Sequence, residues 1–142
     1  MVRRCGSRSA IFVVLFCRGL AAEAPEAMQH VRKSYELAQR GDLAQAAEEM
    51  KTAIRLAPEN PVYVTALGGI AERQWEAGEL EASRKNALRV IEAQPSNVRA
   101  KGVLEGVSLD LGAVLAREGR FKAGVLLARD RAKCTLPLAS PF

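Results

Sequence analysis

The chain has 142 residues, of which 49% are hydrophobic and 5% aromatic, and its formal net charge is +5 at pH 7. This length allows one domain, and its richness in Ala, Leu, Glu, Gln and Arg between residues 23 and 133 predicts an all-α fold. Arg3, Arg4, Arg8 and Arg18 carry most of the net charge, and no dense basic stripe follows them. The charge therefore gives no support to nucleic-acid binding.

Residues 1–22 have the features of a targeting segment. An arginine-rich start precedes the apolar run 10–17, and small residues follow at Gly19, Ala21 and Ala22. The run is too short to cross a bilayer as a helix, which takes about 20 residues, but it matches the apolar part of a secretory signal peptide. We expect export to the periplasm or the exterior. The alternatives are an uncleaved membrane anchor, or a true start at Met28 in a cytoplasmic protein.

Three glycine turns divide the rest of the chain, at Gly41-Asp42-Leu43, Gly78-Glu79-Leu80 and Gly119-Arg120-Phe121. Each turn separates two stretches in which apolar residues recur with helical spacing. The helices that follow the first two turns end at Pro58 and Pro95. Because a short turn between antiparallel helices needs one residue at positive φ, we expect each glycine to provide it. The glycines are 37 and 41 residues apart, which predicts a repeat of helical hairpins.

Six helices are expected in chain order: 27–39, from the cap Asp42 to Pro58, from Asn60-Pro61 to Gly78, from Leu80 to Pro95, about 97–117, and from Phe121 to about Ala132. Neither helix of a hairpin is apolar enough to fold alone, so stacking of neighbouring hairpins has to supply the core. Residues 27–133 would form this repeat domain, and residues 134–142, which contain two prolines, would form a flexible tail.

The turns, small residues and closing prolines resemble the tetratricopeptide repeat family. The first unit, 27–60, has the family's length, with Ala46 and Ala53 at its small positions and Met50 at its large apolar position. The second unit, 64–97, follows three extra residues, Pro61–Tyr63, and has Ser83 where alanine is usual. The third unit, 105–133, is partial and has a longer first helix. The family's aromatic residue near the start of each unit is absent, and His30 takes that place in the first.

The resemblance implies a solenoid of antiparallel helical hairpins, with about three repeats, whose concave face is formed by the first helix of each repeat. It places seven candidate partner-binding residues on that face: Val31, Tyr35, Ala38, Glu72, Trp75, Leu109 and Ala113. The function implied is a non-catalytic scaffold that binds a peptide or helix of another protein. An aromatic pair, Tyr35 and Trp75, could anchor the partner. Packing between repeats is the alternative interpretation of these two residues.

No group of residues indicates catalysis, a cofactor or a metal. His30 has no second histidine or cysteine near it, and Cys134 would be the only thiol left after removal of the leader. Glu72 and Glu76 share a helix face, but no nucleophile accompanies them, so a solvated surface is the better interpretation. An enzymatic role remains only if the chain is part of a larger catalytic protein.

A second hypothesis is structural. A repeat array needs a polar capping helix at its end, and this sequence stops without one. The last helix would then leave Val125, Leu126 and Leu127 partly uncovered, as a surface for another protein or a second copy. On this hypothesis the chain is an incomplete repeat array, either a fragment of a larger protein or a self-associating subunit.

Overall fold

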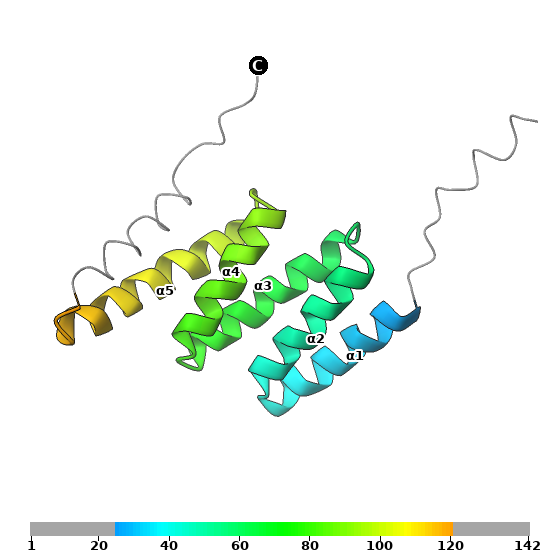
Figure 1. Cartoon of the computed structure of the whole chain (residues 1–142), viewed down its shortest axis with the longest axis horizontal. Coiled ribbons are helices and arrows are strands. Elements are labelled where there is room, and N and C mark those ends of the chain that lie inside the picture. Colours follow the sequence, from blue (N-terminus) through cyan, green and yellow to red (C-terminus); the bar gives the residue numbers. More distant parts are fainter. Residues whose placement is uncertain (1–24, 121–142) are drawn as a thin grey trace, which may run out of the picture.

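The computed structural model describes residues 25–120. This part contains no strand and five α-helices: α1 (Pro25–Arg40), α2 (Leu43–Leu56), α3 (Pro61–Glu76), α4 (Leu80–Ala93) and α5 (Val98–Arg117). The expected all-α class is therefore confirmed for these residues. Figure 1 shows the helices following one another in chain order along the long axis of the molecule. The expected leader, sixth helix and tail lie outside the described residues.

The three glycine turns share one geometry. Gly41, Gly78 and Gly119 have φ angles of 89°, 80° and 69°, which confirms the expectation of positive φ. After each glycine, the next residue donates its backbone N–H to the carbonyl five positions earlier. These bonds join Asp42 to Leu37 (3.0 Å), Glu79 to Gln74 (2.8 Å) and Arg120 to Leu115 (2.9 Å). This is the Schellman motif, which ends a helix while satisfying its last carbonyls, and it ends α1, α3 and α5.

Asparagines begin α3 and α5. The side chains of Asn60 and Asn97 accept hydrogen bonds from the backbone N–H groups of Val62 and Ala100, both at 3.0 Å. Such a cap typically stabilises a helix by about 1 kcal/mol. Asp42 holds the same position before α2 but accepts no capping bond through its side chain. Asp42 therefore occupies the expected cap position, but its side chain does not form the expected capping hydrogen bond.

The three residues Pro61–Tyr63, which lie between the expected repeat units, form the first turn of α3, as expected for a helix that begins at Asn60-Pro61. The Asn60 cap fixes the start of the helix ahead of them, and proline at the first helical position suits the missing N–H there. Tyr63 is only 4% exposed, so this turn also contributes to the core. The helix start expected at Asn60-Pro61 is thus confirmed, and the unit boundary expected at Val64 falls inside α3.

The helices pack in succession around one continuous core. α2 packs against α1 and α3, α4 packs against α3 and α5, and α5 also contacts α3. The largest fully buried apolar side chains come from α2, α3, α4 and α5: Met50, Leu67, Val90, Leu104 and Val107. Each hairpin therefore shares its apolar face with the next, as expected for helices that cannot bury that face alone.

In each of the two hairpins, one fully buried serine joins the two helices. Ser34 Oγ donates to the carbonyl of Ala46 (2.7 Å), and Ser83 Oγ donates to the carbonyl of Ala71 (2.6 Å). Positions 37 residues apart correspond in the two hairpins, so Ser34 corresponds to Ala71 and Ala46 to Ser83. The hairpins carry the same serine–alanine pair with the two partners exchanged. This exchange explains why Ser83 stands where an alanine was expected.

Candidate functional site

A hollow of about 430 Å³ opens between α1, α3 and the beginning of α5. Its lining residues come from all three helices: Tyr35, Ala38, Val62, Thr65, Ala66, Gly69, Ile70, Glu72, Arg73 and Arg99. This volume lies in the range of pockets that bind small molecules. The hollow lies on the face of the first helices of the hairpins, where the sequence placed its groove.

The bottom of the hollow is apolar and its walls expose apolar surface. Ala38 and Ile70 are 5% and 6% exposed and belong to the core, whereas Tyr35 and Val62 are 53% and 63% exposed. Tyr35 and Ala38 are three residues apart and Val62 and Ala66 four apart, so helical spacing puts each pair on one face. Apolar area that a ligand removes from water contributes about 25 cal/mol per Å². The hollow can therefore bind an apolar side chain.

Charged side chains border the hollow on one side. Arg99 Nε lies 3.6 Å from Glu72 Oε2, and the two side chains are 59% and 41% exposed, so this ion pair is weak. The Arg99 guanidinium lies above Gly69, where a Cβ atom would be 3.6 Å from its Nη1. Within residues 25–120, the side chain of Arg73, which also lines the hollow, forms no hydrogen bond or ion pair. This border can attract a carboxylate.

Trp75 lies outside the hollow, at the interface of α3 and α5. Its indole covers Gly106 so closely that a Cβ atom there would be 2.3 Å from two ring carbons. Its Nε1–H donates to Asp110 Oδ2 at 2.6 Å, and the partly buried ring packs against the core. The structure thus places Trp75 in the packing of one repeat on the next, the alternative interpretation of this residue.

The structure brings together three of the seven residues assigned to the groove: Tyr35, Ala38 and Glu72. Val31 is 8% exposed and belongs to the core. Leu109 and Ala113 are exposed on α5 but do not line the hollow. The assigned positions therefore form one continuous site only where α1 faces α3.

Sequence reasoning missed Val62 and Arg73 of α3, and Arg99 of α5. The resemblance assigned Glu72 and Trp75 of α3 to the groove. Trp75 turns instead toward α5, and the face toward α1 consists of positions spaced by three and four residues. That spacing was visible in the sequence, but nothing in it showed which of two adjacent faces would remain open.

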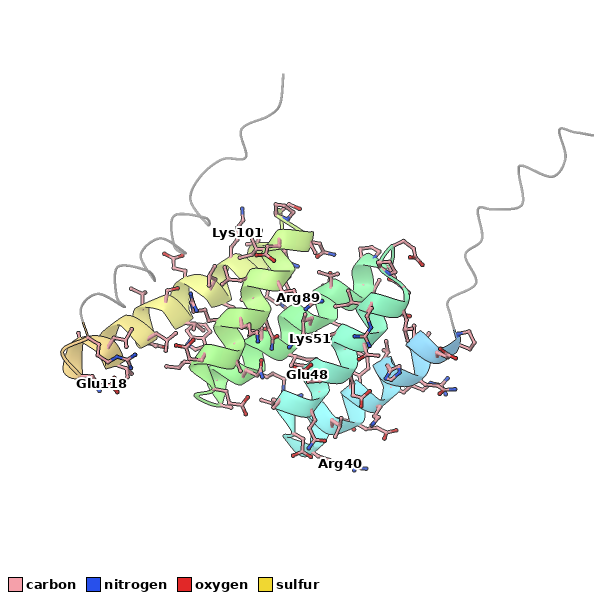
Figure 2. All side chains as sticks on the ribbon, viewed as in Figure 1. Arg40, Glu48, Lys51, Arg89, Lys101 and Glu118 are labelled. Atoms are coloured by element: carbon pink, nitrogen blue, oxygen red, sulfur yellow. The ribbon has the colours of Figure 1, made fainter. Side chains whose placement is uncertain are left out.

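A second hollow, of about 560 Å³, lies between α2 and α4 and is bordered by charges of both signs. Figure 2 shows Glu48, Lys51 and Arg89 together at this junction. Lys51 Nζ donates to Glu48 Oε1 at 2.8 Å. This bond, helped by the charges of Lys51, Lys85 and Arg89, lowers the pKa of Glu48. Four cationic and two acidic side chains line this hollow, with only Ala82 and Leu88 as apolar residues. The smaller hollow with its apolar bottom is therefore the better candidate for binding a peptide.

His30 joins α1 to α2 through an ion-pair cluster. Its Nδ1 lies 2.6 Å from Glu49 Oε2, and Lys33 Nζ lies 2.6 Å from the other carboxylate oxygen. Since an ionised carboxylate only accepts, Nδ1 carries the proton. The bonds from Lys33 and then from His30 lower the pKa of Glu49. Within the described chain, no three His, Cys, Asp or Glu side chains are grouped so that they could hold a metal ion.

No protein-family model matches this chain, and no curated protein matches it either. The resemblance to tetratricopeptide repeats therefore stays a prediction from the turns, the small residues and the closing prolines of the sequence. Among residues 25–120, no helix has both the length and the apolar character needed to cross a membrane.

Proposed function

We propose that this chain is a tetratricopeptide-like repeat protein, a non-catalytic scaffold that binds a segment of another protein in the hollow between α1, α3 and α5. The repeated hairpins and their identical glycine turns support the repeat assignment. The observation that carries the binding proposal is the hollow itself, in which exposed Tyr35 and Val62 stand over an apolar bottom beside Arg73.

Binding would use two kinds of contact. An apolar side chain of the partner would cover the bottom of the hollow and the exposed sides of Tyr35 and Val62. A carboxylate of the partner would accept charge-assisted hydrogen bonds from Arg73 or Arg99, which are stronger than bonds between neutral groups. A few buried contacts of this kind supply most of the affinity in protein interfaces.

Selection from a displayed library of random 12-residue peptides tests this proposal directly. Peptides enriched on the full chain should bind at least tenfold more weakly to Tyr35→Ala and Val62→Asp, because both side chains border the hollow and are exposed. Leu109→Asp is the matched control, since Leu109 is also 53% exposed but does not line the hollow. The proposal fails if no peptide is enriched, or if binding is insensitive to Tyr35 and Val62.

A self-associating or incomplete repeat array is the second candidate, and the surface of α5 favours it. Leu109 and Val114 of this helix are 53% and 40% exposed. Light scattering of the full chain would show a dimer or larger assembly that Leu109→Asp with Val114→Asp reduces to a monomer. A monomer at all concentrations would exclude self-association.

A further inference from the structure

The hollow and the site of Trp75 occupy equivalent places in the repeat. Ala38 and Trp75 are 37 residues apart, and so are Gly69 and Gly106. At the α3–α5 interface, Trp75 covers Gly106. At the α1–α3 interface the equivalent residues are Ala38 and Gly69, which both line the hollow. The first interface therefore has the same glycine as the second, but alanine in place of its tryptophan.

The surface above Gly69 is accessible, whereas that above Gly106 is occupied. A Cβ atom at Gly69 would meet only Arg99 Nη1, at 3.6 Å, within a radius of 4 Å. A Cβ atom at Gly106 would meet three atoms of the Trp75 ring at 3.0 Å or less. The α1–α3 pair is also much more sparsely packed than the α3–α5 pair. An aromatic ring supplied from outside can take the place above Gly69 that Trp75 takes above Gly106.

The charged residue beside the aromatic position differs between the α3–α5 and α1–α3 interfaces. Asp110 accepts the indole N–H of Trp75, and the residue 37 positions earlier is Arg73. A guanidinium only donates hydrogen bonds, so the group next to a ring in the hollow has to be an acceptor. Among residues 25–120, Arg99 is held only by its weak pair with Glu72, so its guanidinium can stack on the face of the ring. The hollow thus favours an aromatic residue with a carboxylate beside it.

On the basis of the proposed function, we infer that the partner segment inserts an aromatic side chain into the hollow above Gly69. An Asp or Glu next to that aromatic residue in the partner pairs with Arg73. The occupant is a peptide of another protein that contains an aromatic residue flanked by acidic residues. At the α3–α5 interface the chain supplies the aromatic ring itself, as Trp75. At the α1–α3 interface the partner supplies it.

Titration of the ¹⁵N-labelled full chain with acetyl-Gly-Asp-Trp-Asp-Gly-amide tests the inference. The amide signal of Gly69 should shift, and the Kd should be at least tenfold lower than for peptides with leucine in place of tryptophan or lysine in place of aspartate. Gly69→Leu should weaken binding at least tenfold. Gly102→Leu is the matched control, because Gly102 is a helical glycine too and lies outside the hollow, and a Cβ atom there would meet nothing within 4 Å.

A second variant, Ala38→Trp, places the ring in the chain itself at the position equivalent to Trp75. It should abolish peptide binding and raise the melting temperature. Equal binding of the leucine peptide would overturn the aromatic assignment while leaving the proposed function intact. If neither these peptides nor any library peptide shifts the amide signal of Gly69, both the inference and the proposed function are wrong. If wild type self-associates and Gly69→Leu prevents it, the occupant is a second copy and the inference is wrong.

Discussion

The α1–α3 and α3–α5 interfaces join helices of the same design, yet one is open and the other is filled. The Schellman turns that end α1, α3 and α5 have the same hydrogen bonds, and asparagine caps begin α3 and α5 in the same way. The main difference is one position, Ala38 in the first interface and Trp75 in the second. A tryptophan side chain is large enough to dominate the packing of an interface.

This difference separates what the repeat does for folding from what it offers for binding. Glycine at Gly69 and Gly106 lets a flat group approach the helix backbone closely. In the second interface the chain uses that approach to hold α5 on α3. In the first it leaves apolar surface and two arginines exposed. The same backbone feature therefore stabilises one junction and provides a candidate binding site in the other.

Adding a methyl group at Gly106 and at Gly69 gives the strongest test of the contrast between the two interfaces. Gly106→Ala would place Cβ 2.3 Å from the Trp75 ring, so the indole has to move and loses its contacts with α5 and Asp110. We expect a loss of about 1–3 kcal/mol in the free energy of unfolding, as for other overpacked sites. Gly69→Ala, whose Cβ meets no crowded atom, should instead be neutral or stabilising by up to about 1 kcal/mol. Urea unfolding measures both.

The single tryptophan gives this experiment an internal control. Displacement of the indole from Gly106 into water should shift the fluorescence of Gly106→Ala to longer wavelength, while Gly69→Ala should keep the wild-type spectrum. Equal stabilities and equal spectra for the two variants would show that the interfaces do not differ in the way described.

Much of the fold followed from local signals. The positive φ at Gly41, Gly78 and Gly119 could be predicted because a tight turn between helices needs a residue without Cβ strain. The start of α3 at Asn60-Pro61 could be predicted in the same way, because asparagine followed by proline is typical of a helix N-terminus, whereas the family's shorter repeat put the unit boundary at Val64, inside this helix. Helix caps and turns depend on adjacent residues, so they can be predicted most directly from the sequence.

The site could be predicted only in part, because it depends on how helices distant in sequence pack together. Tyr35, Ala38 and Glu72 were expected on the face that contains the hollow. The direction in which Trp75 turns depends on Gly106 and Asp110, which are more than 30 residues away. A single sequence does not reveal that contact, so Trp75 appeared as suitable for binding as for packing.

The exchanged serines allow a test of whether the two hairpins are interchangeable inside. Ser34→Ala should lose about 1 kcal/mol, the typical value of one intramolecular hydrogen bond, because it removes the bond to the Ala46 carbonyl. Adding Ala46→Ser should restore much of this loss, since the new hydroxyl could donate to the carbonyl of residue 34 as Ser83 does to Ala71. Thermal unfolding of both single variants and the double variant measures the coupling. Purely additive effects would mean that the first hairpin cannot adopt the arrangement of the second.

The smallest expected effect is a difference between the two hairpins in how their stability depends on pH. Glu49 and Asn86 are 37 residues apart, so the first hairpin has an ionisable group where the second has an amide. The bonds from Lys33 and His30 lower the pKa of Glu49 below its ordinary value of 4.5. A lowered pKa in the folded state means that the stability contributed by Glu49 is present above pH 4.5 and is lost as the pH falls through the folded value.

Glu49→Gln should therefore be less stable than wild type at pH 7, by up to about 1 kcal/mol. The difference should shrink as the pH falls below 4.5, whereas Glu36→Gln, at an exposed position of α1, should match wild type throughout. A gap that is constant with pH would show that the side chain of Glu49 acts by packing and not by its charge.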